Sequence, residues 1–395
     1  MAALPEGDPA PLDGQLPKIG DLKNKPFSLY VHVPYCSKRC GYCDFNTYTP
    51  SELDREDQIG SWLNSAVKET IFARKILGQE LEIDTIFFGG GTPSLLDAEV
   101  IEEYLKIVSQ QFILNSGIEI TLEANPDTVT ETKASDWLSA GVNRISIGMQ
   151  SSVKNVLQTL DRTHNPEYVL NSVEIIKKAG FTNFSLDLIY GTPGESIFDW
   201  EKTLKDSISI NPPHISAYSL VIEPGTKMGA QLNRGEINAV SDDDAADKYQ
   251  LAEKIFSENG YSWYEISNWS KNDKECRHNL NYWKGNNWWG IGPGAHSHIN
   301  GVRWWNEKLP KKWREKLDNN QSPALAREEL TSNQILNEEV MLLSRLKDGI
   351  YKSRFAEKNV EQLLNDDFVT EVSGNLVLTL KGRLLADEVF RQLTS

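Results

Sequence analysis

Apolar and polar positions follow two alternating patterns between residue 28 and about residue 220. Short runs rich in β-branched and aromatic residues are each followed by longer segments in which apolar residues recur at helical spacing. Such alternation predicts an α/β fold with parallel strands joined by right-handed helical crossovers. The expected strands cover residues 28–33, 83–88, 118–124, 144–149, 184–189 and 215–220. The expected helices cover residues 54–77, 98–112, 166–179 and 197–209.

The pattern changes after residue 220. Eight of the eleven tryptophans lie between Trp263 and Trp313, and glycine turns interrupt this stretch. Further on, a helix at 333–346, a short strand at 375–379 and a closing helix at 384–393 are expected, an order that resembles a small winged-helix-like module. We therefore expect four parts, namely a flexible tail (1–25), a βα-barrel region (26–220), a Trp-rich extension (221–324) and a small C-terminal module (325–395).

Composition and charge narrow the range of functions. The chain of 395 residues carries 41 basic and 56 acidic residues, which gives a formal charge of −15. A chain this acidic is a poor non-specific binder of nucleic acid, so no nucleic-acid partner is expected. The basic stretch 308–316 is interpreted as a solvated helix start. There is no run of about 18 apolar residues, and the acidic, proline-rich start does not resemble a signal peptide, so a cytoplasmic protein is expected.

The strongest chemical signal is a run of three cysteines, Cys36, Cys40 and Cys43, with the spacing C-x3-C-x2-C. Three thiolates from one loop can hold three irons of a [4Fe–4S] cluster and leave the fourth iron open to a small molecule. A structural zinc site that also uses Cys276 is the alternative, although zinc sites favour paired C-x2-C turns. A disulfide framework is disfavoured because four cysteines in 395 residues are sparse.

The cysteine run resembles that of the radical S-adenosylmethionine (SAM) superfamily. The resemblance implies an incomplete (β/α)6 barrel, in which the cysteine loop follows the first strand and lies at the rim formed by the C-terminal strand ends. It also implies that SAM chelates the open iron through its amino and carboxylate groups and is cleaved to a radical. Tyr42 is implied to pack the adenine, and Tyr30, at the start of the run, is counted among the cofactor-binding residues.

Residues at the ends of later strands extend the candidate site. Gly90, Gly91 and Thr92 follow the second strand, where glycines let the backbone approach a ligand closely. Glu123 ends the third strand and offers a charge-assisted bond to a cation. Each of these residues also has a structural explanation, as part of a tight turn or as a satisfied polar group. The set resembles the coproporphyrinogen III oxidase-like branch of the superfamily, which contacts SAM through residues that match Glu123, Gln150, Arg162 and Asp187.

A second motif, Cys276-Arg-His-Asn-Leu-Asn-Tyr-Trp283, resembles the signature of HemW-type heme chaperones. The resemblance implies a protein that binds heme and delivers it to acceptor proteins, membrane-associated ones among them. Imidazole can ligate heme iron, so His278 is the candidate ligand, and an extended segment would turn Cys276 and His278 toward one pocket. The alternative for His278 is a buried, hydrogen-bonded core residue.

Two enzymes are the rival interpretations of these motifs. The oxygen-independent coproporphyrinogen III oxidase has another cysteine two residues after the third, where this chain has Phe45, and an N-terminal extension, where this chain has a proline-rich tail. A radical SAM RNA-modifying enzyme is disfavoured by the acidic charge. The expected function is a heme chaperone that binds a [4Fe–4S] cluster, SAM and heme, with no oxidase activity.

Overall fold

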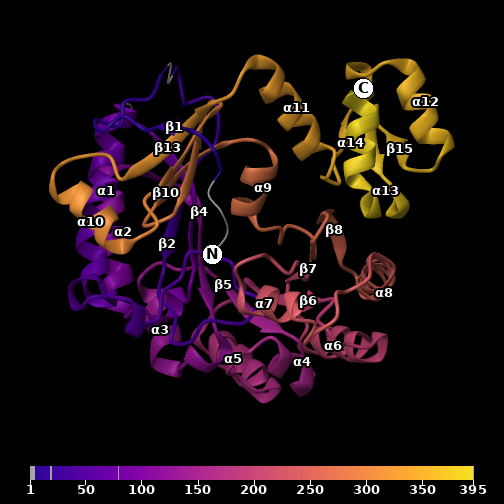
Figure 1. Cartoon of the computed structure of the whole chain (residues 1–395), viewed down its shortest axis with the longest axis horizontal. Coiled ribbons are helices and arrows are strands. Elements are labelled where there is room, and N and C mark those ends of the chain that lie inside the picture. The colour runs from indigo at the N-terminus through magenta and orange to yellow at the C-terminus, as the bar shows by residue number, and fades with distance from the viewer. Residues whose placement is uncertain (1–4, 18–19, 79, 395) are drawn as a thin grey trace.

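A parallel sheet forms the centre of the computed structural model, which describes residues 5–17, 20–78 and 80–394 (Figure 1). Its six strands lie in chain order and each pairs in parallel with the next, as the strand–helix alternation predicts. They are β2 (Phe27–Val33), β3 (Glu82–Gly90), β4 (Ile113–Ala124), β5 (Arg144–Gln150), β6 (Phe184–Tyr190) and β7 (His214–Ser219).

Helices cover the outer face of this sheet. They are α1 (Trp62–Leu77), α2 (Ala98–Gln111), α3 (Glu131–Ser139), α5 (Pro166–Ala179) and α6 (Ile197–Ile210), whereas α4 (Lys154–Thr159) packs in a separate small cluster with Met228. The predicted helix 54–77 is shortened, because short 3₁₀ turns occupy Arg55–Asp57 and Ile59–Ser61 and Gly60 has a low helix propensity. Helices α3 and α4 were not predicted.

Further strands, antiparallel except for one parallel pair, extend the same sheet at both edges. Strand β10 (Asn287–Ile291) pairs in parallel with β2, and beyond it follow β11 (His296–Ile299), β12 (Val302–Asn306) and β13 (Ala324–Glu329). At the other edge, β9 (Asn268–Ser270) and β8 (Ser262–Glu265) follow β7. Residues 221–324 therefore complete the barrel sheet from both sides, whereas a distinct extension was expected. The helices of this region are α7 (Lys227–Asn233), α8 (Asp242–Glu258), α9 (Arg277–Trp283) and α10 (Pro310–Asp318).

The described part of the N-terminal segment is bound to the sheet, which differs from the expected flexible tail. Strand β1 (Asp8–Pro9) pairs antiparallel with β13, and the Ala10 amide donates to the Leu325 carbonyl. Leu22 is buried in the main core. The physical reason is that β13 would otherwise be an edge strand with unpaired backbone groups, which the segment satisfies.

The C-terminal module has a hydrophobic core of its own, which includes Val340, Leu363 and Val389. The predicted helix, strand and closing helix are present, and the prediction missed α12, α13 and two short strands. The elements are α11 (Ser332–Leu343), β14 (Ile350–Tyr351), α12 (Glu357–Asn365), β15 (Val369–Val372), β16 (Asn375–Leu378), α13 (Leu380–Leu384) and α14 (Ala386–Thr394), with the strand order β14-β16-β15. None of the helices within the described residues combines the length and apolar character that crossing a bilayer requires.

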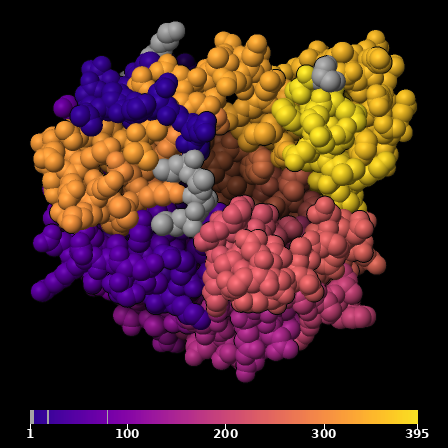
Figure 2. Space-filling model, in the orientation of Figure 1, coloured from indigo at the N-terminus to yellow at the C-terminus, as the bar shows by residue number. Residues whose placement is uncertain are grey.

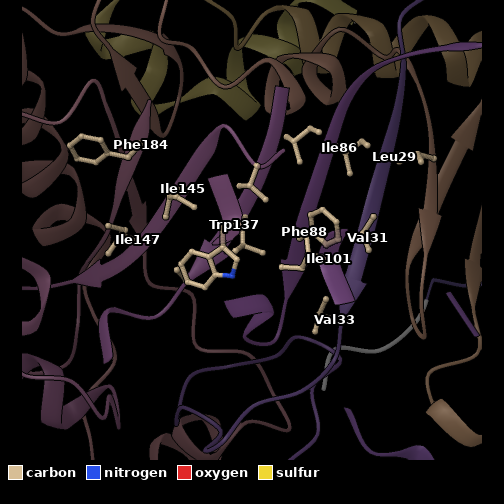
Figure 3. Packing of buried hydrophobic residues seen from close by; sticks show 14 of the residues in the cluster. Leu29, Val31, Val33, Ile86, Phe88, Ile101, Trp137, Ile145, Ile147 and Phe184 are labelled. Atoms are coloured by element: carbon tan, nitrogen blue, oxygen red, sulfur yellow. The ribbon is translucent and has the colours of Figure 1, made fainter. Parts of the chain in front are cut away.

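Alternate residues of the barrel strands face opposite environments. The apolar set packs under the helices, as Figure 3 shows for Leu29, Val31 and Val33 of β2 and for Phe88 of β3, which lie with Trp137 of α3 in one core. The residues between them point into the barrel and are largely polar. A sheet that is apolar outside and polar inside forms a cavity in place of a packed barrel centre.

Candidate functional site

The barrel encloses a cavity of about 440 Å³, which we call the first cavity. Polar side chains enter it at every second position of three neighbouring strands, such as Arg144 and Ser146 of β5 and His214 and Ser216 of β7. All thirteen residues that sequence analysis selected lie on its wall. They are Tyr30, Cys36, Cys40, Tyr42, Cys43, Gly90, Gly91, Thr92, Glu123, Gln150, Arg162, Asp187 and His278.

The cysteine loop directly follows β2, so it lies at the C-terminal rim of the barrel. The Cys36 amide donates to the Tyr48 carbonyl at 3.0 Å, and the Thr92 hydroxyl lies 3.6 Å from the Cys36 sulfur. The Arg162 guanidinium lies 3.5 Å from the Cys40 sulfur. The loop is therefore held both by its own backbone and by residues from other strand ends.

Three thiols face the first cavity from one loop. Among the described residues, no three His, Cys, Asp or Glu side chains are close enough together to surround one metal ion. Burial raises the pKa of the Cys36 thiol to about 11 and also raises the pKa of Cys43. Because thiolates are the form that binds a metal, any metal group bound here would have to displace the thiol protons.

The glycine loop after β3 packs against β2 with no room for side chains. A Cβ atom on Gly91 would lie 2.6 Å from the Tyr35 carbonyl oxygen, and Gly90 has φ = 110°. The Gly90 amide donates to the Glu123 carboxylate at 3.1 Å, which orients the loop toward the cavity. Burial, reinforced by the negative charge of Asp187, raises the pKa of Glu123 to about 8. A cationic ligand would restore its ionised form.

Two further groups organise the opposite wall. Arg162 donates to the Asn125 side chain at 2.7 Å and to the Gly148 carbonyl at 3.1 Å. Asp187 accepts hydrogen bonds from three hydroxyl groups at 2.7–2.9 Å. The donors are Ser146, Ser185 and Ser216. Both side chains are thus fixed before any ligand arrives.

Sequence analysis missed two buried charged residues, Arg144 of β5 and Glu119 of β4. Arg144 is only 1% exposed, and its Nε atom has no hydrogen-bond partner among the described residues. The negative charge of buried Glu119 acts on this guanidinium. The polar alternation Glu119-x-Thr121-x-Glu123 and Arg144-x-Ser146 was the available signal, because polar residues at every second position of a barrel strand point inward.

The second motif forms helix α9, so the extended conformation considered for Cys276 and His278 is not adopted. The Glu119 carboxylate accepts the backbone amides of Arg277 and His278 at 3.2 and 3.0 Å, which satisfies the amino end of the helix. His278 is 2% exposed, and its two ring nitrogens bond to the hydroxyls of Thr85 and Tyr282 at 2.7 and 2.8 Å. The motif therefore fastens α9 to the strands, and iron ligation by His278 would require breaking one of these bonds.

A second cavity, of about 700 Å³, lies beside the first and is bounded by β10, β11, α9 and α11. Its wall includes Trp283, Trp288, His296 and Lys308. Figure 2 shows a hollow between the yellow C-terminal module, the salmon segment and the indigo N-terminal half. Five residues line both cavities, and we call them the shared wall. They are Tyr30, Asp44, Phe45, Asn279 and Tyr282.

The chain is similar in sequence to the radical SAM superfamily and to proteins named as heme chaperones. A family model described as the radical SAM superfamily matches residues 30–207. The chain is 41% identical to the heme chaperone HemW of Mycobacterium tuberculosis over 96% of this chain and 97% of that protein. It is 32% identical to the heme chaperone HemW of Bacillus subtilis, over 92% and 98% of the two chains.

Among solved structures, the chain is similar to the coproporphyrinogen III oxidase HemN of Escherichia coli, which is described as a radical SAM enzyme. The TM-score is 0.79 at 23% identity, over 93% of this chain and 90% of that chain. This likeness concerns the fold, and it covers the barrel together with the regions that follow it.

Proposed function

Because the chain belongs to the HemW-type heme chaperones of the radical SAM superfamily, we propose that it binds a [4Fe–4S] cluster, SAM and heme and passes heme to acceptor proteins in the cytoplasm or at membranes. The observation that carries the proposal is the 41% identity to a named heme chaperone over nearly the whole chain. It is combined with a three-cysteine loop that opens into a polar barrel cavity.

The first cavity supplies the groups that a cluster and SAM require. Cys36, Cys40 and Cys43 would hold the cluster, which with SAM would supply one-electron chemistry when bound. Glu123 and the glycine loop offer a carboxylate and close backbone approach to the amino group of SAM, while Arg162 stands between the cysteine loop and the strand ends. Tyr42, which lies partly buried on the same wall, would pack the adenine.

The rival function is oxidative decarboxylation of coproporphyrinogen III. The fold likeness to the E. coli oxidase does not separate the two functions, because it rests on 23% identity. Anaerobic cluster reconstitution followed by parallel assays of heme binding and coproporphyrinogen consumption tests the proposal. We expect heme binding without porphyrinogen turnover, and robust protoporphyrinogen formation would make the chain an oxidase.

Replacing either Arg162 or Glu123, two charged residues on the wall of the first cavity, should weaken SAM binding and leave the cluster in place. Arg162→Ala and Glu123→Ala each delete one charge-assisted contact, which typically contributes about 1.5–3 kcal/mol, or roughly ten- to a hundredfold in affinity. The measurement is titration of the reduced cluster's EPR spectrum with SAM, with iron content as the control. Unchanged titrations in both variants would remove these residues from the SAM site.

SAM affinity should also depend on pH through Glu123. Its pKa of about 8 means that the carboxyl is mostly protonated in the free protein at pH 7. Because N–H groups of the SAM amine donate better to the carboxylate than to the protonated acid, binding below pH 8 releases a proton from Glu123, in addition to any proton that the amine loses on chelating iron. This part of the pH dependence should raise the affinity by up to about tenfold per pH unit and level off above pH 8. Glu123→Gln should lose this contribution and show a shallower slope than wild type. An equal slope in that variant would assign the titration to another group.

A further inference from the structure

Heme needs a place apart from the cluster and SAM, which occupy the first cavity under the proposed function on which this inference rests. We propose that heme binds in the second cavity, with His296 as the ligand of its iron. The volume of about 700 Å³ is in the range of pockets that enclose organic cofactors. This assignment replaces the sequence-based choice of His278 by a residue outside the recognised motif.

Elimination among the six histidines of the chain leads to His296. Four of them use both ring nitrogens in hydrogen bonds within the described structure. These four are His32, His214, His278 and His298. A fifth, His164, is 3% exposed, bonds to the Met149 carbonyl and lines neither cavity.

His296 differs from the other five in being exposed at the cavity wall. It is the first residue of β11, and within the described residues neither of its ring nitrogens takes part in a hydrogen bond. Its ring stacks on Trp305, with centroids 5.9 Å apart and planes inclined by 28°. This stacking holds the imidazole in one orientation while its nitrogens stay available, as an iron ligand requires.

The rest of the cavity wall suits a flat, aromatic macrocycle that carries carboxylates. Trp288 packs edge-on against Tyr282, with ring centroids 4.7 Å apart, and Trp283 lies on the same wall. Phe45 is 61% exposed although it is large and apolar, so a ligand on it would remove apolar surface from water. Lys308 lines the cavity close enough to act electrostatically on His296 and adds a positive charge that matches the heme carboxylates.

The test compares heme with the same macrocycle lacking iron. Full-length, cluster-reconstituted protein is titrated anaerobically with hemin and, separately, with protoporphyrin IX. Hemin binding is followed by difference spectra in the Soret region, and protoporphyrin binding by fluorescence. Wild type, His296→Ala and His278→Ala are measured side by side. For His296→Ala we expect hemin affinity to fall at least about tenfold, the lower end of what even an outer-shell partner of a metal ligand contributes. Protoporphyrin affinity should not change.

Each other outcome contradicts a defined part of the proposal. If His296→Ala lowered the affinities for hemin and for protoporphyrin IX equally, the residue would be part of the cavity wall and not an iron ligand. An unchanged hemin spectrum in His296→Ala, with loss in a folded His278→Ala, would return the ligand to helix α9. A wild type that binds protoporphyrin and hemin equally would exclude iron ligation altogether. Failure of wild type to bind either porphyrin would instead contradict the proposed function itself.

Discussion

Replacing any one of Cys36, Cys40 or Cys43 by alanine should abolish the [4Fe–4S] signal of the reconstituted protein. Each thiol faces the first cavity, and the cluster would be left with two protein ligands in a site where the fourth iron already has none. Loss of the cluster should also remove every SAM-dependent spectral change. Iron content and the EPR spectrum of the reduced protein measure both effects.

Cys276→Ala is the matched control for this prediction. Its sulfur is buried at the start of α9, 3.7 Å from the Glu119 carboxylate, so the residue is part of the barrel bottom and not of the rim. The variant should keep its full iron content. Cluster loss in Cys276→Ala, with retention in one of the three rim variants, would overturn the assignment of the cluster loop.

Glu119→Ala should cause a large loss of stability. The substitution leaves the Arg277 and His278 amides without their acceptor and deprives the buried Arg144 guanidinium of a nearby negative charge. An orphaned buried donor costs about 1–3 kcal/mol, so the free energy of unfolding should fall by roughly 3 kcal/mol or more. Urea unfolding followed by tryptophan fluorescence measures this change.

Two further substitutions distinguish the loss of the helix cap and of the charge near Arg144 from a general effect of removing a carboxylate. Glu119→Gln keeps one acceptor oxygen for the helix amides but not the charge, so its stability should lie between those of wild type and Glu119→Ala. Glu131→Ala removes a carboxylate from an exposed ion pair with Lys178 and should leave the urea midpoint unchanged. Equal stability of Glu119→Ala and wild type would mean that α9 does not depend on this cap.

Local patterns in the sequence were enough to predict six parallel strands, and the resemblance to the radical SAM superfamily supplied the barrel and its rim. The strand–helix alternation gave the six parallel strands within a few residues, because their outward positions are buried apolar residues such as Leu29, Val31 and Ile145. Once the strands are parallel, their C-terminal ends must meet at one rim. That is why the cysteine loop, the glycine loop and Glu123 reach one cavity, although their roles there stay predictions.

The features that were missed depend on contacts between residues far apart in the chain. Strand β10 pairs with β2 across more than two hundred residues, and nothing local in either segment specifies that partner. Helix α9 begins where it does because Glu119, from β4, caps it, and the segment has little apolar periodicity of its own. The hydrogen bond between His278 and Thr85 could not be predicted for the same reason, because these two residues are far apart in the sequence and meet only in the folded chain.

The shared wall has a thermodynamic consequence. Because Tyr30 and Tyr282 stand between the two cavities, an occupant of one cavity that moves or fixes these side chains changes the free energy with which the other cavity is filled. Linkage requires this effect to be reciprocal, so that if SAM tightens heme by some factor, heme tightens SAM by the same factor. Under the proposed function, the occupancy of the SAM site would therefore set how tightly heme is held.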